Sequence, residues 1–584
     1  MTWIQRTDVA SRHARRREHV DRTNRVTGRA LTIDLTAPIL QPTRSADLFA
    51  LGLSFPPDPS VMTANLRDPA TSFPCDLDAP RETFARLRDA LTAARYDEPT
   101  ISRAMDAPLL YEIKRLADGR TTLTDAPTDA KTALVRLFID SETLPADAAR
   151  ALLGDETVQD LQALGLLVAA PDDAASVIAT VMMYPTQGLW LVSDRQPLRM
   201  ADAHAIPQDY VFSAISGLTQ RFLEVLPDAP GGRVLELCAG TGIAALRAVR
   251  RGAAEAWAID IAPRSVHCAR FNALLNGLED RVHVQQSDVW STLGGESFDL
   301  VVAHPPYVPA LAHRFDFRDG GADGEQVARR IIEGLGAHVR PGGRYVMTAA
   351  LSDRRGAPIT KRVREWLGPD GNDFDLVVLE NGEYGPMEAY RNVSKGAKDF
   401  VDCERWLRHF DALGVERFAV CAVEIRRDAR GRAPITERRV AGRAPDHRAV
   451  DWVFRWANRV ARAGNTPEAR LRGQRPRVAP GVRLAVHLES DSSGSWGTVA
   501  AVVETAWPTH NIVKALPLAP TLLELCDGTR DVPALLAGLR EAGLVSPDVG
   551  VGEVAHIVEV FCAAAALELA DCPLPPEETV SRAP

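Results

Sequence analysis

The chain has 584 residues, a length that suggests three or four domains. Hydrophobic residues make up 46% and charged residues 25%, a composition that predicts a folded soluble protein and excludes a chain that stays unfolded. The net charge is −9 and the isoelectric point about 5.9, so the chain as a whole has no general attraction to nucleic acid or to an anionic membrane.

The cysteines and the apolar runs further limit which sites and which cellular locations are possible. The eight cysteines are scattered and form no CxxC pair, which is typical of reduced thiols rather than of a disulfide framework or a metal site. No apolar run reaches the roughly 18 residues that span a bilayer. The Arg-rich RHARRREH near the start has no apolar core after it and is therefore no secretory signal; a solvated tail is favoured over a transit peptide. We expect a cytoplasmic protein with no membrane contact and no metal.

The first two predicted units precede any obvious motif. Residues 1–80 are rich in Pro, Asp, Arg and Thr and predict an irregular arm, with ALTIDL as a candidate strand. Residues 81–195 predict a helical unit, because apolar residues recur near every 3.6 positions from Pro80 to about Leu116. Three further helices (TALVRLFIDS, ADAARALL and TVQDLQALGLL) and two strands (SVIATVMMYPT and LWLVSD) follow. This order resembles a winged helix.

The charges of this winged-helix-like unit oppose a role in reading DNA. Between Thr132 and Asp173 two arginines stand against eight acidic residues, and the candidate recognition helix has no Lys or Arg. Phosphate contacts supply most of the non-specific affinity for DNA. A packing or substrate-presenting role is therefore favoured.

Residues 196–430 predict an α/β domain. From Arg233 to about Arg426 strands and helices alternate, as expected for a parallel sheet with helices on both faces. The seven strand candidates are RVLELCAG, AEAWAIDI, VHVQQSD, FDLVVAHPP, GRYVMTAA, FDLVVLENG and FAVCAVEIR. A long insert with GPMEAYRNVSKGAKDF separates the last two.

The first of these strands ends in VLELCAGTG, an apolar run closed by a Gly-x-Gly turn. Such a turn brings the backbone close to a ligand at the carboxyl edge of a sheet. Gly240 and Gly242 lack Cβ atoms and permit that approach. Glu236 lies in the same strand, while Asp260 and Asp288 end the next two strands. The turn with an acid 20 residues later also matches the NAD fingerprint, so the turn alone leaves the cofactor open.

The fourth strand ends in VVAHPPY, an apolar run that stops at a Pro-Pro corner with an aromatic residue after it. Two prolines fix φ and stiffen the corner. The run FRDGGADGEQVARRIIEGLGAHVRPGGRYVM, from Phe317 to Met347, follows. In this run we expect Gly320 and Gly321 to shape a turn and Asp323 to cap the N-terminus of a helix.

Together the two loops resemble the cofactor and substrate loops of class I S-adenosylmethionine (SAM) methyltransferases. The RDGGxDGxxVxRRI run is similar to the segment after the Asn-Pro-Pro-Tyr motif in HemK-like protein glutamine methyltransferases. The resemblance covers about 200 residues and implies a Rossmann-like, seven-stranded core flanked by α+β winged-helix-like domains. Glu236, Asp288 and the Pro-Pro corner favour SAM over NAD, because the corner has no role in a dehydrogenase.

The resemblance also implies roles in the cofactor site. Glu236 would accept a hydrogen bond from the methionine ammonium group, directly or through water, and Asp260 would accept from both ribose hydroxyls. Asp288 would accept from the adenine amine, with the Val289 N–H at a ring nitrogen. Cys238, where many of these enzymes have Gly, is interpreted as a small apolar filler. The predicted cofactor-binding residues are Glu236, Cys238, Gly240, Gly242, Asp260, Ile261, Asp288, Val289 and Tyr210. For Tyr210, in PQDYVFSAISGLTQ, ligand contact and plain packing both stay open.

The Pro-Pro corner supplies the predicted catalytic residues His304, Tyr307 and Pro305. Methyl transfer from a sulfonium is an in-line displacement, so the protein must hold a lone pair about 3 Å from the methyl carbon. A corner carbonyl can accept from the target N–H, and Tyr307 can lie beside a planar or cationic group. His304 stands where this family usually has Asn, Asp or Ser. A neutral imidazole both donates and accepts, and with a pKa near 6.5 it can also take a proton from an ammonium group.

The remaining chain predicts two smaller units. Arg426–Arg443 has seven arginines against two acids and predicts a linker or exposed basic patch, which leads into a linker and small α/β segment over 431–510. That segment contains a helix (HRAVDWVFRWANRVARAG) and two strands (VRLAVHLES and TVAAVVET). Residues 511–584 predict a helical or winged-helix unit whose LLELCDGTRDVPALLAGL resembles PqqD-like modules. Such modules bind the leader of a precursor peptide by strand addition; a plain packing domain is the alternative.

Three functions remain as hypotheses. The favoured one is N-methylation of a peptide or protein amine, including dimethylation of the terminal amine of a ribosomally made peptide natural product, because a proton acceptor at His304 suits an amine. The second is glutamine-amide methylation of a translation factor. The third is amino-methylation of rRNA or DNA through the basic stretch, which the acidic flanks disfavour. No sequence feature indicates the oligomeric state.

Overall fold

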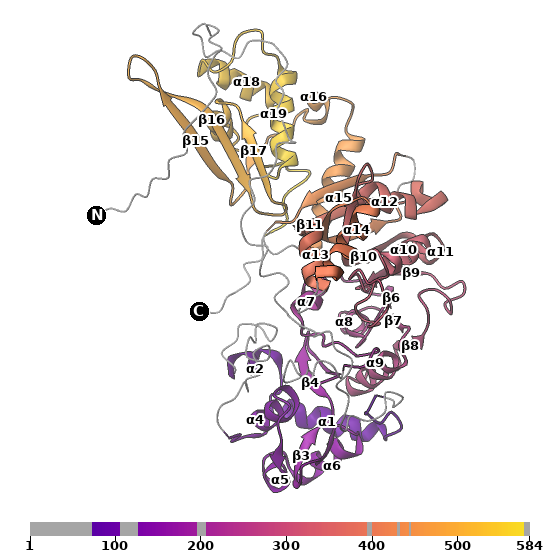
Figure 1. Cartoon of the computed structure of the whole chain (residues 1–584). Coiled ribbons are helices and arrows are strands. Elements are labelled where there is room, and N and C mark those ends of the chain that lie inside the picture. Colours follow the sequence, from indigo (N-terminus) through magenta and orange to yellow (C-terminus); the bar gives the residue numbers. More distant parts are fainter. Residues whose placement is uncertain are drawn as a thin grey trace.

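The computed structural model describes residues 73–104, 126–195, 206–393, 400–428, 432–442 and 446–576. Figure 1 shows an N-terminal unit (indigo and purple), a central α/β body and a C-terminal unit (yellow) at the opposite end of the molecule. Most of the arm predicted for residues 1–80, including ALTIDL, lies outside the described residues. Among the described helices, none combines the length and the apolar composition needed to cross a bilayer.

The N-terminal unit contains the predicted helices and strands, together with two short strands, β1 and β2, that were not predicted. Its helices are α1 (Arg81–Ala93), α2 (Glu98–Ala104), α4 (Ala130–Leu134), the π-helix η2 (Val135–Ile139), α5 (Ala146–Leu153) and α6 (Asp155–Ala163). Strands β1 (Leu144–Pro145), β2 (Leu167–Ala170) and β3 (Asp173–Ala179) form a sheet of order β1-β3-β2, and β4 (Met182–Thr186) and β5 (Leu189–Ser193) form a separate hairpin. The single strand expected over SVIATVMMYPT is thus two strands. The assignment of the N-terminal unit to the winged-helix class stays a prediction.

The central sheet has eight strands in the order β8-β7-β6-β9-β10-β12-β11-β13. They are β6 (Arg233–Leu237), β7 (Glu255–Asp260), β8 (Val282–Gln286), β9 (Phe298–Ala303), β10 (Val339–Arg354), β11 (Asp375–Tyr384), β12 (Val415–Arg426) and β13 (Thr436–Val440). β6 to β10 run parallel, and β12 is antiparallel to both of its neighbours. All seven predicted strands form, and the predicted Rossmann-like α/β class of the core is confirmed.

Helices cover both faces of this sheet. They are α7 (Gly217–Glu224), α8 (Ile243–Arg250), α9 (Pro263–Leu275), α10 (Gln326–Glu333), α11 (Leu335–His338), α12 (Ile359–Trp366), the 3-10 helix η4 (Gly368–Asp373), α13 (Pro386–Val393) and α14 (Phe400–Ala412). In β9, Leu300 and Val302 join one hydrophobic cluster and Val301 and Ala303 join another. Because side chains alternate across a strand, the two clusters are the cores on the two faces.

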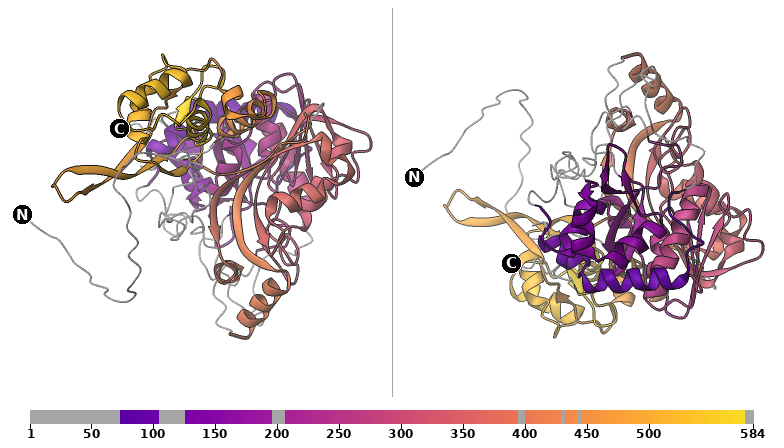
Figure 2. Two further views of the ribbon diagram at one scale, coloured as in Figure 1. Left: turned by 90° about the horizontal axis from the view of Figure 1, so that it is seen from above. Right: turned by 90° about the horizontal axis from the view of Figure 1, so that it is seen from below.

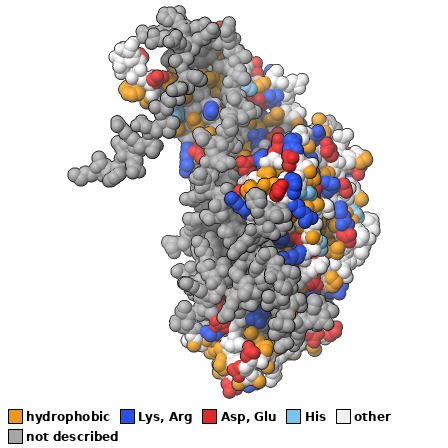
Figure 3. All heavy atoms as spheres, in the orientation of Figure 1, with side chains coloured by type: hydrophobic (Ala, Val, Ile, Leu, Met, Phe, Trp, Pro, Cys, Tyr) orange, Lys and Arg blue, Asp and Glu red, His pale blue; other side chains and the backbone are white. Residues whose placement is uncertain are grey.

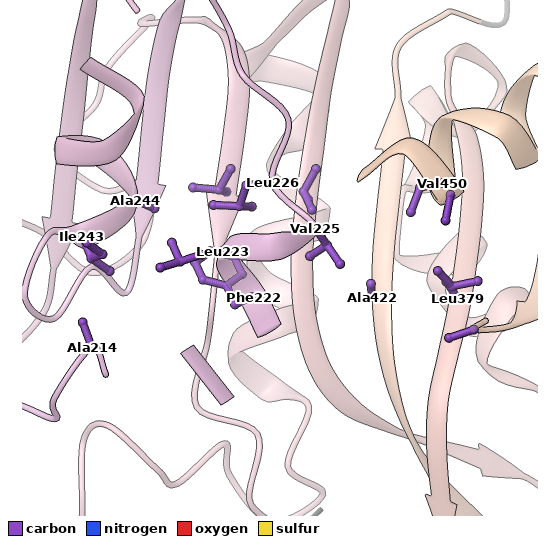
Figure 4. Packing of buried hydrophobic residues seen from close by; sticks show 14 of the residues in the cluster. Ala214, Phe222, Leu223, Val225, Leu226, Ile243, Ala244, Leu379, Ala422 and Val450 are labelled. Atoms are coloured by element: carbon purple, nitrogen blue, oxygen red, sulfur yellow. The ribbon is translucent and has the colours of Figure 1, made fainter. Parts of the chain in front are cut away.

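One of these cores links distant parts of the chain. Phe222 and Leu223 of α7 lie beside Ile243 of α8, and farther along the sheet Val450 lies against Leu379 of β11 (Figure 4). Val450 belongs to α15 (His447–Arg462), the helix predicted over HRAVDWVFRWANRVARAG. The N-cap of α15 is Asp446, whose carboxylate accepts from the Arg448 and Ala449 N–H groups. α15 therefore packs on the core sheet.

The structure differs from the linker or exposed basic patch predicted over Arg426–Arg443. β13 adds to the core sheet, parallel to β11. Arg438 pairs with both Asp353 and Glu380, and Arg432 pairs with Asp375. These acids lie on β10 and β11, far away in the sequence, so the arginines are neutralised inside the fold. Over the coloured part of the face in Figure 3, Lys and Arg side chains lie interspersed with Asp and Glu.

The C-terminal unit contains a three-stranded sheet and a group of helices. The strands are β15 (Arg483–Ser490), β16 (Trp496–Thr505) and β17 (Asn511–Ala515), in the order β15-β16-β17; β14 (Arg477–Val478) pairs with β18 (Leu567–Glu568). The helices are α16 (Pro467–Arg470), α17 (Ala519–Leu525), α18 (Val532–Glu541) and α19 (Val551–Ala563). β17 was not predicted, and the predicted boundary at residue 510 falls inside this sheet. The likeness to PqqD-like modules stays a prediction.

Two asparagines of α9 hold the N-terminal unit against the core. The Asn272 side chain accepts from the Val192 N–H at 2.7 Å and donates to the Val192 carbonyl at 3.2 Å. Asn276 makes the same pair of bonds with Trp190, at 3.0 and 2.7 Å. Asn272 Nδ2 also lies 3.0 Å from the carbonyl of Thr241, in the Gly-x-Gly turn. The edge of β5 is therefore satisfied by side chains in place of another strand.

Replacing Asn272 should cost stability. Asn272→Ala leaves the buried Val192 N–H and two carbonyls without these bonds, and we expect the free energy of unfolding to fall by about 2–4 kcal/mol. Urea unfolding followed by fluorescence measures the change. The matched control Asn372→Ala, at an exposed position, should change stability by less than about 0.5 kcal/mol. Equal effects of the two substitutions would contradict the proposed bonding role.

Candidate active site

A cavity of about 440 Å³ lies at the carboxyl edge of β6, β7 and β9. With one exception, every predicted site residue lines it: Glu236, Cys238, Gly240, Asp260, Ile261, Asp288, Val289, Tyr210, His304, Pro305 and Tyr307. The exception is Gly242, which has φ +76° and is the N-cap of α8. A Cβ there would lie 3.1 Å from the Ala269 Cβ. Gly242 therefore serves the start of α8 and its packing on α9.

The Gly-x-Gly turn is closed by a carboxylate from the neighbouring strand. Asp260 accepts from the Gly240 N–H through Oδ2 and from the Ala262 N–H through Oδ1, both at 2.9 Å. A Cβ on Gly240 would meet no atom within 4 Å, so its open side faces the cavity. Burial raises the pKa of Asp260, although the two N–H bonds oppose the shift. Asp260 thus fixes the turn as well as lining the cavity.

Glu236 is buried and turned toward the start of α8. Its Oε1 accepts from the Ala244 N–H at 3.1 Å and its Oε2 from the Ala245 N–H at 2.8 Å. These are N–H groups of the first helical turn, which have no partner inside the helix. Burial raises the pKa of Glu236 to about 8, against the two N–H bonds that lower it. Glu236 is therefore a helix-end acceptor that also faces the cavity.

At the far side of the cavity, Asp288 forms an ion pair with Arg330 of α10, with Oδ2 and Nη2 2.7 Å apart. Val289 has a positive φ of 52° and Cys238 one of 56°. Residues that carry a side chain rarely adopt a positive φ, whereas glycine adopts it without a steric cost. Cys238 thus has a backbone conformation that favours glycine. Ile261 is 54% exposed.

His304 lies in an aromatic stack. Its ring centroid is 5.3 Å from that of Phe222 and 5.9 Å from that of Tyr307, with interplanar angles of 26° and 28°. Among the described residues, none forms a hydrogen bond with the imidazole, so both ring nitrogens are free for a ligand. Burial lowers the pKa of His304 from 6.5 to about 4. The expectation of a pKa near 6.5 is therefore wrong, because these surroundings disfavour the charged form.

The Pro-Pro corner is braced by the residues of the RDGG run. The Val308 N–H donates to the Arg318 carbonyl at 3.0 Å, and the Gly320 N–H donates to the Val308 carbonyl at 2.9 Å. A Cβ on Gly320 would lie 2.6 Å from the Pro306 carbonyl oxygen, so only glycine permits this approach. These backbone bonds tie the corner to the RDGG run and fix its position.

The expected N-cap is wrong by two residues. Asp323 accepts from the Glu325 N–H at 3.0 Å, but the N-cap of α10 is Glu325 itself. The Glu325 carboxylate is fully buried and accepts from Arg362, Arg354 and the Ser352 N–H. Because Glu325 needs this long-range network, the local Asp323-Gly pattern did not reveal it. The network ties the start of α10 to β10 and α12.

Several cavity residues lack any motif that marks them in the sequence. Tyr210 donates its hydroxyl to the Arg195 carbonyl at 3.3 Å and packs against Phe212 and Phe317. The additional lining residues include Phe212, Phe222, Phe317, Arg330 and Tyr384. Phe317 and Arg330 belong to the FRDGG run and Phe212 to the PQDYVFSAISGLTQ segment, which were the available signals. All eight cysteines are free, and among the described residues no group of acids, His and Cys is arranged to hold a metal.

Residues 209–359 match the family model of the methyltransferase small domain. This region is a class I, SAM-dependent methyltransferase domain of the HemK-like type. A release factor glutamine methyltransferase of Gloeobacter violaceus is 30% identical over 162 residues, which are 24% of this chain and 56% of that protein. A ribosomal protein uL3 glutamine methyltransferase of Bradyrhizobium diazoefficiens is 35% identical over 123 residues, 19% of this chain and 38% of that one.

One longer alignment with a relative and one alignment with a solved structure cover larger shares of both chains. A release factor glutamine methyltransferase of Xylella fastidiosa is 30% identical over 187 residues, 30% of this chain and 65% of that protein. The chain therefore spans about half the length of the curated relatives that it matches. The crystal structure of a ribosomal protein L11 methylase from Lactobacillus delbrueckii subsp. bulgaricus aligns at 17% identity and a TM-score of 0.23, covering 42% of this chain and 96% of that one.

The methyltransferase domain uses SAM as its cofactor. The cavity suits that molecule, because SAM carries positive charge at its sulfonium and ammonium groups. The lining contains the acids Glu236, Asp260 and Asp288, and the open side of Gly240 gives close access to the backbone. Ile261 and Val289 supply an apolar surface between Asp260 and Asp288.

Cofactor binding should release a proton from Glu236. With a pKa of about 8, this carboxyl is largely protonated at neutral pH, and a cation in the cavity favours its charged form. We expect calorimetry of SAM binding near pH 7, in two buffers of different ionisation enthalpy, to show release of up to about one proton. In Glu236→Gln, whose one side-chain oxygen can still accept from one of the two helix N–H groups, the release should disappear. The same proton count in wild type and variant would exclude Glu236 as the source.

Proposed function

We propose that the chain transfers a methyl group from SAM to a side-chain nitrogen of a protein, with glutamine amide as the acceptor. The observation that carries this proposal is the single cavity that joins the Gly-x-Gly turn to the His-Pro-Pro-Tyr corner. The relatives named above are protein glutamine methyltransferases, which supports methylation of a protein nitrogen. The chemistry of His304 and the corner supports the choice of nitrogen.

In this proposal the acids of the sheet edge hold the cofactor. Asp260 keeps its bonds to Gly240 and Ala262, and its remaining lone pairs accept from the ribose hydroxyls. Glu236 attracts the methionine ammonium by its charge, while its oxygens stay on the α8 N–H groups. Asp288 and the Val289 N–H face the adenine ring. Bound SAM would supply the methyl group as an electrophile; the residues only hold and orient it.

The substrate loop then positions the acceptor nitrogen. A carbonyl of the Pro305–Pro306 corner accepts one amide N–H, and the stiff, braced corner keeps that carbonyl in place. His304 is neutral at physiological pH, so one ring nitrogen donates to the amide carbonyl and the other can accept. This is the donor and acceptor pair that an Asn side chain offers at the same place. The Tyr307 and Phe222 rings both lie beside the imidazole, with their planes tilted from it by 28° and 26°.

The low pKa of His304 removes the chemical reason for preferring an amine. An ammonium group must lose a proton before it can attack, and a group whose pKa is about 4 is a poor acceptor for that proton. The earlier preference for a terminal amine of a peptide natural product therefore loses its basis, and the relatives give it no support. An amide nitrogen needs no such deprotonation before attack. As the N–CH3 bond forms and the S–CH3 bond breaks, the amide loses the N–H proton that the corner carbonyl holds, and that proton passes to water.

A protein substrate also suits the walls of the cavity. Tyr384 of β11 and Ala389 of α13 line it, and Tyr307 packs on the aromatic cluster formed by Tyr384, Tyr390, Trp406, Phe410 and Phe418. The insert between β11 and β12 thus builds one wall next to the substrate loop. The arginines that motivated a nucleic-acid substrate, Arg432 and Arg438, are paired with acids in the fold.

The experiment that tests the acceptor is mass spectrometry. Purified chain and deuterium-labelled SAM are incubated with a protein extract of the native host, and labelled peptides are fragmented to locate the methyl group. We expect one methyl on a glutamine side-chain amide. Label on an N-terminal amine or on nucleic acid would overturn the proposed acceptor, and absence of any label in protein would overturn the function.

His304 should act without titrating near neutral pH. We expect kcat to show no ionisation of His304 between about pH 6 and 8, and NMR of the ring to give a pKa of about 4. His304→Ala should lower kcat by about 10²-fold through lost positioning, whereas His304→Asn should keep much of the activity. SAM affinity should stay near normal in both. A kcat that rises through pH 6–7 in wild type and not in His304→Asn would instead establish a base.

A further inference from the structure

Exposed hydrophobic side chains gather on one sheet of the C-terminal unit. Among the described residues, six of the nine large hydrophobic side chains that are most exposed lie on β15, β16 and β17: Leu484, Val486, Leu488, Trp496, Val499 and Ile512. Soluble proteins rarely expose contiguous apolar surface unless it binds a partner. The β15–β16 hairpin projects away from the body of the molecule, as Figures 1 and 2 show. A partner can therefore reach it.

β15 is the edge of this sheet. All eight of its residues are exposed, and within the described part of the chain it pairs only with β16. Natural proteins protect such edges with Pro, Lys, inward-pointing charges or bulges. β15 contains neither Pro nor Lys, and the bulge of the hairpin lies on β16, at Val499, which leaves β15 regular. The row of unpaired N–H and C=O groups is thus open to another strand.

The apolar face of β15 continues a face that is buried elsewhere. Leu484 is opposite Val503 and Val486 is opposite Ala501, and both of these β16 residues are buried in the hydrophobic core. Residues opposite each other in an antiparallel pair share a face. The core face therefore extends outward across β15 and ends uncovered, with Leu484 and Val486 each 40% exposed and Leu488 55% exposed.

The sequence of β15, RLAVHLES, is complementary to itself when reversed. An antiparallel copy centred on Val486 puts Leu484 opposite Leu488 of the second strand and Arg483 opposite Glu489, each twice. Directly opposed residues of this kind stabilise a strand pair, whereas like charges there destabilise it. Shifting the centre to Ala485 or His487 loses both the Leu–Leu and the Arg–Glu pairs. One register thus satisfies the apolar and the charged positions together.

We propose that β15 pairs with β15 of a second copy of this chain around a two-fold axis at Val486, so that the two three-stranded sheets form one continuous sheet. The same patch serves both copies, as a two-fold interface requires. Leu484, Val486 and Leu488 of the two copies form a single apolar row, and the contacts between the copies remove part of their surface from water. The interface adds no residue to the cofactor cavity, so it stands apart from the proposed methyl transfer.

The test uses charge reversal and mixing on the full chain. Arg483→Glu places two Glu–Glu oppositions in the dimer and Glu489→Arg places two Arg–Arg oppositions, so each variant alone should dimerise at least about tenfold more weakly. When the two variants are mixed, every opposition becomes Arg–Glu, and a heterodimer of near wild-type stability should form. Sedimentation velocity over a concentration series up to about 100 μM measures the dimer. SAM calorimetry checks that each variant is folded.

The Arg483–Glu504 pair within one copy and a Lys substitution at Val486 provide two controls for the mixing experiment. Arg483 Nη1 lies 4.0 Å from Glu504 Oε2 in the same copy, so Arg483→Glu also disturbs that exposed pair. Recovery on mixing cannot arise from that local effect, because it depends on the partner. Val486→Lys places two cations at the two-fold axis and should leave only monomer, whereas Lys at exposed Val168 of the N-terminal unit should have no effect.

Three results would overturn the proposal. The wild-type chain could stay monomeric at every concentration. It could dimerise equally well with Lys at position 486, or the mixed variants could fail to recover. If Val486→Lys leaves a monomeric wild type unchanged in assembly but lowers methyl transfer to protein, the edge binds a strand of the substrate, and the second-copy pairing is wrong.

Discussion

The site depends on carboxylates that bond to backbone N–H groups at the edge of the sheet. Asp260 joins the Gly240 turn to the start of the next loop, and Glu236 accepts from the first turn of α8. Each acid closes a loop that would otherwise leave buried N–H groups without partners. The shape of the cofactor loop is therefore set by the protein itself. The same burial raises the pKa of both acids, which leaves them ready to respond to a cationic ligand.

The second loop is built by packing more than by hydrogen bonds. Phe222 of α7 and Tyr307 both lie beside His304, while the RDGG run bonds to the corner through Val308 and Gly320. An imidazole in these surroundings stays neutral and keeps one donor and one acceptor. The packing around His304 thus both holds its ring in place and keeps it neutral. A fixed, neutral ring suits the orientation of an amide better than the deprotonation of an amine.

Short sequence patterns predicted the strands and turns whose formation depends on neighbouring residues. Seven strands follow from apolar runs, and both loops follow from the Gly-x-Gly and Pro-Pro turns that end two of these runs. β13 was missed because seven arginines indicate a solvated linker, whereas Arg438 pairs with Asp353 and Glu380, which are 85 and 58 residues away. The pKa of His304 likewise depends on Phe222 from another element. Gly242 was assigned to the ligand, but its Cβ position faces Ala269. Such contacts are set by tertiary packing, which no short sequence pattern contains.

The N-terminal unit is part of the scaffold of the cofactor loop. Asn272 of α9 bonds to Val192 of β5 on one side and to the Thr241 carbonyl of the Gly-x-Gly turn on the other. An asparagine that is fully buried with all these bonds made has one favourable orientation, because a rotated amide would place donors against donors. The position of β5 and the position of the turn are therefore coupled through one side chain. These bonds tie the N-terminal unit to the turn that lines the cofactor cavity, which gives this large flank a physical reason to accompany the core.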